Sequence, residues 1–181
     1  MNKITKGFTL IELLIVIALL GALAVALLAA LDPLEQIKKG TDTGVRNTVA
    51  EIHGAMVRYS ALQGGVMPFD TLVNSGTLNF AAIGTVPSGP GYSALDKVVA
   101  SGELKSDFAQ LAGPQLEKIF LTGSNSSGNQ TVAVCYAPTA KSFRLDANTK
   151  FGQGNATVTE LSGCPSVTGT VLGGTCYWCV R

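Results

Sequence analysis

The sequence predicts an α+β protein in which a long N-terminal helix packs on a small antiparallel β-sheet. Three observations predict this class. An apolar run opens the chain, an amphipathic stretch of helical period follows it, and a glycine-rich part with alternating segments and four cysteines closes it. We therefore expect a helix with an apolar membrane half and an amphipathic half, and a C-terminal loop held by disulfides.

The apolar run covers residues 8–31, and only Thr9, Glu12 and Gly21 interrupt it. A helix over these residues reaches about 36 Å at about 1.5 Å per residue, enough to cross a hydrocarbon core of about 30 Å. Two lysines precede the run and no basic residue lies inside it. The positive-inside tendency therefore places the N-terminus in the cytoplasm and the rest of the chain outside it.

Glu12 does not fit an ordinary membrane anchor. A carboxylate at the centre of a spanning helix costs about 2.5–3.5 kcal/mol, and less near the interface, so it is rare without a partner. Its own segment offers no nearby cation, because Lys6 lies off the i, i+3 and i, i+4 rows. We therefore expect the partner of Glu12 to come from another molecule.

The stretch Gly7-Phe8-Thr9-Leu10-Ile11-Glu12 follows a short leader with Lys3 and Lys6. It resembles the class III signal of type IV pilins and of type II secretion pseudopilins. The resemblance implies a pilin-like fold, cleavage between Gly7 and Phe8 by a prepilin peptidase, and N-methylation of Phe8. It also implies that Glu12 stays ionised and pairs with the Phe8 amine of a neighbouring subunit during assembly.

Two other interpretations compete for this segment. A secretory signal peptide would explain the lysines and the small residues near 28–30, but its apolar region would be shorter and would carry no acid. A plain single-span anchor would explain the length, but not Glu12 or the Gly7-Phe8 junction. We favour the pilin-like interpretation.

The chain divides into five predicted parts. They are a leader (1–7), a transmembrane or filament-core helix half (8–31), an amphipathic helix half (32–63), a variable αβ-loop region (64–130), and an antiparallel sheet with the C-terminal disulfide region (131–181). Gly21 and Pro33 are the weak points of the long helix, because glycine lowers helix propensity and proline removes a hydrogen bond. The resemblance implies that the helix can unwind between two such residues in a filament.

The amphipathic half carries an apolar stripe of helical spacing, formed by Val45, Val49, Ile52, Met56 and Tyr59. We expect this stripe to pack on the sheet and the helix to end near Leu62-Gln63, before Gly64-Gly65.

The second half of the chain is richer in strand and turn signals. We expect short helices over Ser93–Leu104 and Pro114–Phe120, and a turn or loop at 124–129. Alternating segments predict a hairpin of Thr131–Ala137 with Ser142–Ala147, a third strand, and a fourth strand at or near the sheet edge. The third and fourth strands are predicted over Ala156–Leu161 and Thr175–Val180.

The four cysteines are Cys135, Cys164, Cys176 and Cys179. An even number in an exported domain predicts two disulfides. A Cys176–Cys179 bond is disfavoured, because residues three apart on a strand point to opposite faces. Cys135 therefore bonds either Cys176 or Cys179, and Cys164 takes the other. A zinc site lacks a second Cys-x-x-Cys pair, and a redox motif would start a helix rather than lie beside a strand.

Composition excludes several function classes. The formal net charge is +1 without a basic cluster, so nucleic acid enters only as a ligand of the assembled filament. His53, the only histidine, is expected to be a solvated helix residue, and no catalytic arrangement or cofactor site is legible. We expect no metal site: residues 152–181 contain one acid, Glu160, which argues against the calcium site of major pseudopilins.

The resemblance implies a structural subunit of a bacterial type IV pilus that serves adhesion, twitching motility or DNA uptake. Its precursor would lie in lipid in the inner membrane, with the head outside the cytoplasm, and the assembled pilus would lie on the cell surface. The implied partners are further copies in a helical filament, the prepilin peptidase/N-methyltransferase, the inner-membrane assembly platform and the assembly ATPase. The alternatives are a type II secretion pseudopilin and a membrane-anchored binding domain that does not polymerise.

Overall fold

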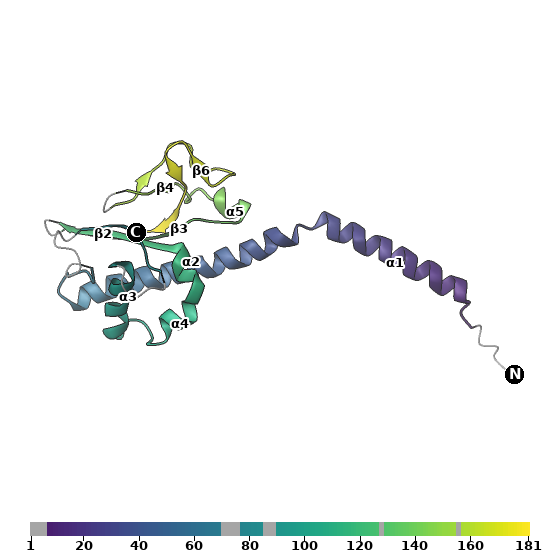
Figure 1. The fold of residues 1–181 in the computed structure, drawn as a ribbon, viewed down its shortest axis with the longest axis horizontal. Helices are drawn as coiled ribbons and strands as arrows, with labels where there is room; N and C mark the ends of the chain where they lie inside the picture. The colour runs from purple at the N-terminus through teal and green to yellow at the C-terminus, as the bar shows by residue number, and fades with distance from the viewer. Residues whose placement is uncertain (1–6, 70–76, 85–89, 127–128, 155–156) are drawn as a thin grey trace. The chain divides into compact units, whose positions relative to one another are not determined.

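The computed structural model of the chain describes residues 7–69, 77–84, 90–126, 129–154 and 157–181. These residues form helices and antiparallel strands, which confirms the α+β class (Figure 1). The chain divides into two compact units, residues 1–37 and residues 38–181, and each is described by itself.

The first unit contains helix α1 (Leu10–Ala30), none of whose side chains is buried. The helix is continuous through Gly21 and ends at Leu31, whose backbone is extended. The next helix, α2 (Pro33–Leu62), begins at the proline. The proline ring fixes φ at a helical value, and the backbone N–H that proline lacks would have no partner in the first turn of a helix. A single helix from Phe8 to Leu62 is therefore not observed, and unwinding between Gly21 and Pro33 in a filament stays a prediction.

Helix α2 buries the predicted stripe in the second unit. Val45, Val49, Ile52 and Met56 are buried, and Tyr59 is partly buried against the same core. The helix ends at Leu62 as expected. The Gly65 amide donates to the Ser60 carbonyl at 2.7 Å, and the positive φ of Gly64 and Gly65 (65° and 93°) makes this turn possible.

The sheet is antiparallel, with the strand order β1-β2-β3-β8. Its strands are β1 (Thr77–Ala82), β2 (Ile119–Ser126), β3 (Asn129–Tyr136) and β8 (Trp178–Val180). Strand β3 pairs along its whole length with β2, whereas β8 pairs only with the last three residues of β3, 134–136. One edge of β3 is therefore without a strand partner over residues 129–133 in the described part of the chain.

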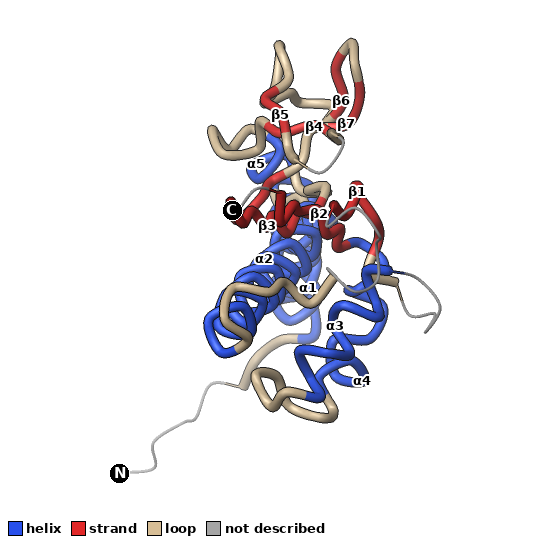
Figure 2. The backbone as a smooth tube through the Cα atoms, turned by 90° about the vertical axis from the view of Figure 1, so that its left-hand side faces the viewer, coloured by secondary structure: helices blue, strands red, loops and turns tan. Residues whose placement is uncertain are grey.

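Both faces of the sheet are covered (Figures 1 and 2). On one face, α2 and helix α3 (Pro90–Ala100) share a core with inward side chains such as Leu121 and Val134. On the other face, Phe151 packs with Cys135, Cys179 and neighbouring aromatic rings. Alternation along β3 produces this division, because successive side chains point to opposite faces.

The helices between β1 and β2 differ in part from the prediction. Helix α3 ends at Ala100, short of the predicted Leu104, and it is followed by α4 (Phe108–Ala112) and the 3₁₀ helix η1 (Gly113–Lys118). The predicted helix over Pro114–Phe120 is thus a single 3₁₀ segment with its proline in the first turn. Ile119 and Phe120 belong to β2 instead.

The predicted hairpin of Thr131–Ala137 with Ser142–Ala147 is wrong in its second strand. The hairpin partner of β3 is β2, and residues 124–126 and 129, predicted as a turn or loop, belong to the two strands. Residues 127–128 lie outside the described residues. Lys141–Arg144 forms one helical turn, α5, because Thr149 and Asn148 close a local turn onto the Phe143 carbonyl and the Asp146 carboxylate.

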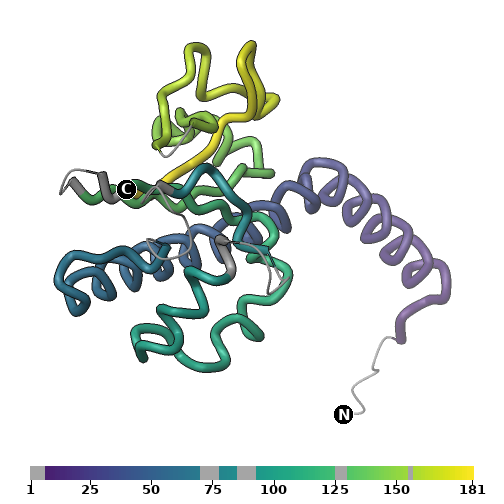
Figure 3. Tube along the Cα trace, turned by 60° about the vertical axis from the view of Figure 1, so that its left-hand side comes forward, coloured from purple at the N-terminus to yellow at the C-terminus, as the bar shows by residue number. Residues whose placement is uncertain are grey.

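The last forty residues return to the sheet through two small ribbons (Figure 3). They are β4 (Phe151–Gly152) with β5 (Thr159–Glu160), and β6 (Thr170–Val171) with β7 (Gly174–Thr175). The predicted strand Ala156–Leu161 is therefore only two residues long in its described part. The predicted edge strand Thr175–Val180 is confirmed for β8, whereas Thr175 belongs to β7.

A buried carboxylate fastens α2 to the segment that leaves β3. Asp42 accepts the amide protons of Thr139 and Ala140 at 2.8 and 2.7 Å, and the Thr139 hydroxyl donates to it at 2.9 Å. These three bonds explain how a charged side chain that is 2% exposed is tolerated in the packed face of α2.

Replacing Asp42 should therefore destabilise the second unit, residues 38–181, which we call the head. We expect Asp42→Ala to lower the free energy of unfolding by about 2–4 kcal/mol, because it leaves amide groups without acceptors. Urea unfolding of the full chain in detergent, followed by the fluorescence of Trp178, measures the change. The neighbouring, exposed Thr43→Ala is the control, and equal midpoints for the two variants would contradict this account.

Candidate functional site

The first turn of α1 is closed by a reciprocal pair of side chains. The Thr9 amide and hydroxyl both donate to Oε2 of Glu12, at 2.9 and 2.8 Å, and the Glu12 amide donates to the Thr9 hydroxyl at 3.3 Å. This arrangement is a capping box, in which the helix-start residue and the third helical residue satisfy each other's backbone N–H groups.

The capping box gives Glu12 local partners that our sequence interpretation missed. That interpretation looked for a cation and found none within reach. The signal was present, since Thr9-Leu10-Ile11-Glu12 has the Thr-x-x-Glu spacing of a capping box. Both bonds from Thr9 use one oxygen, and an ionised carboxylate offers about four acceptor positions. Glu12 therefore keeps capacity for a further donor while it caps its own helix.

The predicted cleavage point lies just before this helix start. Gly7 and Phe8 are exposed and non-helical, and the Phe8 side chain is 82% exposed. No helical turn has to open for an enzyme to reach the bond between them. Gly7, Phe8 and Glu12 thus lie within one short segment at the start of α1, and their roles in processing and assembly stay predictions.

The remainder of α1 has no cover within its own unit. Its length and composition are those of a membrane-spanning helix. Apolar side chains such as Leu13, Ile17 and Leu20 are more than half exposed, and charged side chains are absent after Glu12. Exposed apolar area of this extent costs free energy in water at about 25 cal/mol per Å², so α1 requires lipid or other apolar helices around it.

The cysteines pair in one of the two ways that the sequence left open. Cys135 on β3 bonds Cys179 directly opposite it on β8, with a Cα–Cα distance of 4.1 Å. Cys164 bonds Cys176 with a Cα–Cα distance of 5.9 Å and closes the loop that carries β6 and β7. The predicted pair of disulfides is confirmed, and the first one locks β8 to the sheet.

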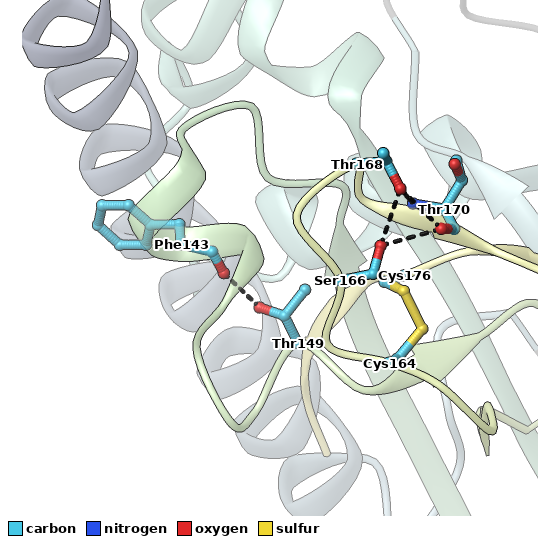
Figure 4. Close-up of a disulfide and its surroundings, with 7 residues drawn as sticks. All are labelled: Phe143, Thr149, Cys164, Ser166, Thr168, Thr170 and Cys176. Atoms are coloured by element: carbon cyan, nitrogen blue, oxygen red, sulfur yellow. Dashed lines mark hydrogen bonds between the residues drawn. A yellow bond between two sulfur atoms is a disulfide. The ribbon is translucent and has the colours of Figure 1, made fainter.

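Hydroxyl groups stiffen the loop next to the second disulfide (Figure 4). The Ser166 and Thr168 hydroxyls both donate to the Thr170 carbonyl at 2.9 Å. The Cys176 amide donates to the Gly169 carbonyl at 2.8 Å across the same loop. A loop with few buried apolar groups is thus held by a covalent bond and by local hydrogen bonds.

Arg46 joins α2 to the C-terminal region. Its guanidinium lies over the rings of Phe143 and Trp178, at 4.4 and 4.5 Å, and donates to Asp146 at 3.0 Å. Partial burial acts to raise the pKa of Asp146, but hydrogen bonds from the Asn148 backbone and from Arg46 outweigh it and hold that pKa below its usual value. No sequence signal pointed to this cluster, because its members lie about a hundred residues apart.

A cleft of about 570 Å³ opens beside the part of β3 that has β2 on one edge and no described strand on the other. Its lining includes His53 and Val57 of α2, Thr157 and Val158 from the segment before β5, and Arg181. The imidazole of His53 is half-buried and bonds to the Val132 backbone, so this helix residue is less solvated than the sequence predicts. Within the described residues, no three His, Cys, Asp or Glu side chains gather where they could hold a metal ion.

Comparison with protein families identifies the N-terminal segment. Residues 2–28 match the family described as the prokaryotic N-terminal methylation motif, which is the class III prepilin signal of type IV pilins. This motif implies processing by a prepilin peptidase and assembly into a pilus-type filament, and with α1 it fits an inner-membrane precursor. No curated protein and no solved structure matches the chain.

The burial of His53 predicts a pH dependence of stability. Burial lowers the pKa of His53 below 6.5 by more than the bond to Val132 raises it. On acidification the unfolded chain therefore takes up this proton first, and the free energy of unfolding falls as the pH drops through 6.5. Urea midpoints of the full chain in detergent, compared between about pH 7.5 and pH 6, should show the loss. His53→Gln should show a smaller change, and an identical change would contradict the assignment.

Proposed function

We propose that the chain is a structural subunit, a pilin, of a bacterial type IV pilus. It inserts in the inner membrane through α1, is cleaved between Gly7 and Phe8, is N-methylated on Phe8, and polymerises into a surface filament. The filament serves adhesion, twitching motility or DNA uptake. The observation that carries the proposal is the methylation motif on an uncovered apolar helix whose first turn holds a carboxylate.

Such a subunit exists in two states, in the membrane and in the filament, and both account for the exposed surface of α1. Before assembly, lipid covers the apolar side chains. After assembly, the α1 helices of neighbouring copies cover one another and the heads face outward. Both environments satisfy a helix with no buried side chain of its own, and a non-polymerising anchor would use only the first.

Glu12 supplies the register of assembly. Cleavage at Gly7 creates a new ammonium group on Phe8, and a second subunit's Glu12 has acceptor positions beyond those that Thr9 uses. In a bundle of low dielectric, the desolvation of both charges offsets much of their attraction. The pair therefore specifies how far one helix slides along another more than it adds net stability.

The head has a structural role in this proposal. Within the described residues, the single histidine bonds to a backbone group beside a cleft, and no acidic side chain lines that cleft. A stapled α+β head on a polymerising helix is suited to form the outer surface of a fibre. We therefore assign no catalytic activity to the chain.

Processing is the first test. Co-expression of the full chain with an active prepilin peptidase should yield a mature chain that begins with N-methylated Phe8, as read by mass spectrometry. Gly7→Val should block this cleavage, with Gly40→Val, another exposed glycine, as the matched control. Cleavage near Ala30, or a persistent Met1 in the wild type, would contradict the pilin assignment.

Assembly is the second test. Glu12→Ala should still be cleaved at Gly7–Phe8 but should give few or no shed fibres in electron micrographs, because the incoming amine has no carboxylate to meet. Glu51→Ala, an exposed acid on α2, should assemble as the wild type does. Normal fibres from Glu12→Ala would refute the pairing. Short periplasmic assemblies instead of surface fibres would assign the chain to pseudopili.

A further inference from the structure

The cleft beside β3 lies at one edge of the sheet and is built to receive an apolar side chain. In the described part of the chain, residues 129–133 of β3 pair with β2 on one edge and have no strand on the edge that β8 occupies further along, and residues 130–133 line the cleft. Val57 at its border is exposed, and Met67 and Val132 within it are buried. Arg181 is exposed at the same place and is the one side chain with a fixed charge among the described lining residues.

The opposite flank of the second unit carries a projecting apolar side chain. Strand β1 forms the other edge of the sheet, α3 packs against it, and α4 follows α3 on that flank (Figure 2). Leu111 of α4 is 73% exposed. Asp107 lies one turn before it, is exposed, and accepts the Leu111 amide through its backbone carbonyl at 2.9 Å. A leucine and a carboxylate four residues apart lie on one face of a helical turn.

An open filament of identical subunits requires this kind of pairing. Its contacts are heterologous, which means that one surface of a subunit meets a different surface of the next. A self-complementary patch would close a dimer instead. The second unit offers an apolar cleft at the β3 edge of the sheet and an exposed leucine, Leu111, on the flank of β1 and α3.

We propose that the cleft beside β3 of one head binds Leu111 of the next copy of this chain, with Asp107 of that copy facing Arg181. This inference rests on the proposed function, because the filament places heads side by side. The occupant is a second copy for two reasons. The charges of Asp107 and Arg181 are complementary, and Asp107 lies one helical turn from the exposed Leu111, whereas Arg181 lies among the residues that line the apolar cleft.

Leu172 is another exposed apolar side chain that could enter the cleft of a neighbouring copy, but no acidic residue lies near it in the sequence. This side chain, between β6 and β7, is fully exposed. Its neighbours from 166 to 175 carry no charged side chain that could face Arg181. Within its own chain Arg181 lies over the Phe151 ring at 4.9 Å and its charge acts on Glu160, and a contact through Leu172 would bring no carboxylate of a second copy to it.

Disulfide trapping in shed fibres tests the contact directly. Cysteines cross-link when their Cβ atoms approach to about 4 Å, so the pair Val57→Cys with Leu111→Cys should form intersubunit ladders on non-reducing gels. Each single variant should give no ladder. The pair Val57→Cys with Leu172→Cys is the matched competitor, and a ladder from that pair in place of the first would overturn the proposal.

Charge reversal gives an independent measurement. Asp107→Arg and Arg181→Glu should each lower the yield of shed fibres about tenfold, because each places like charges at the contact, and the double variant should recover most of the yield. Asp96→Arg, an exposed acid on α3, is the control and should leave the yield unchanged. Wild-type yields from both single variants, or no recovery in the double variant, would refute the contact.

The two experiments separate this inference from the proposed function. If the wild-type chain is processed but never forms fibres, the function itself fails. If wild-type fibres form normally while the 57–111 pair gives no ladder and the charge variants show no rescue, only the head contact fails.

Discussion

The structure depends on one constraint, which is that the chain does not cover its own longest apolar surface. Every side chain of α1 remains accessible within its unit, although the helix is apolar from its second turn to its end. A sequence that folds as an isolated soluble domain would bury such a helix in its core. The environment of α1 must therefore come from outside the chain, and the features of the N-terminal turn follow from that requirement.

In the head, a small sheet must be held in a fixed orientation on α2, a helix whose first residues lie outside the second unit. Packing of the α2 stripe supplies buried apolar area, but apolar contacts do not fix the orientation of the sheet on the helix. Asp42 and Arg46 fix this orientation through directional contacts with residues that follow β3 in the chain. Asp42 accepts backbone amide protons there, and Arg46 lies over two aromatic rings. The Cys135–Cys179 bond then holds β8 beside β3, so the aromatic rings around Arg46 keep their places.

The predictable parts of the fold were those written in local patterns. The α2 stripe at Val45 to Tyr59, its glycine stop and the edge strand β8 follow from spacing and turn chemistry alone. The segment 142–147 misled because alternation of apolar and polar residues is also compatible with a short turn. Leu145 there is 51% exposed, and the side chains of Thr149 and Asp146 fix the turn, because the Thr149 hydroxyl donates to the Phe143 carbonyl and the Asp146 carboxylate accepts the Asn148 amide. Strand β2 was missed because its end, Ser124 to Ser126, reads as a loop until β3 pairs with it.

The same distinction holds for the site. Gly7, Phe8 and Glu12 were legible because a short motif places them together, and the spacing Thr9-x-x-Glu12 could have revealed the capping box as well. The Arg46 cluster and the cleft beside β3 were not legible. Their residues come from distant segments, and only the packed tertiary structure brings them into contact.

The capping box at Thr9 and Glu12 has a consequence for the reverse of assembly. A carboxylate that held no partner in the free subunit would make departure from a filament costly, because an uncompensated charge would return to the lipid. Here a departing subunit loses the neighbour's amine but keeps the two Thr9 donors on Glu12. In a filament built as proposed, polymerisation then adds one partner to a carboxylate that is already hydrogen-bonded, at a modest free-energy difference, and the same molecules can be withdrawn into the membrane and used for another round of extension.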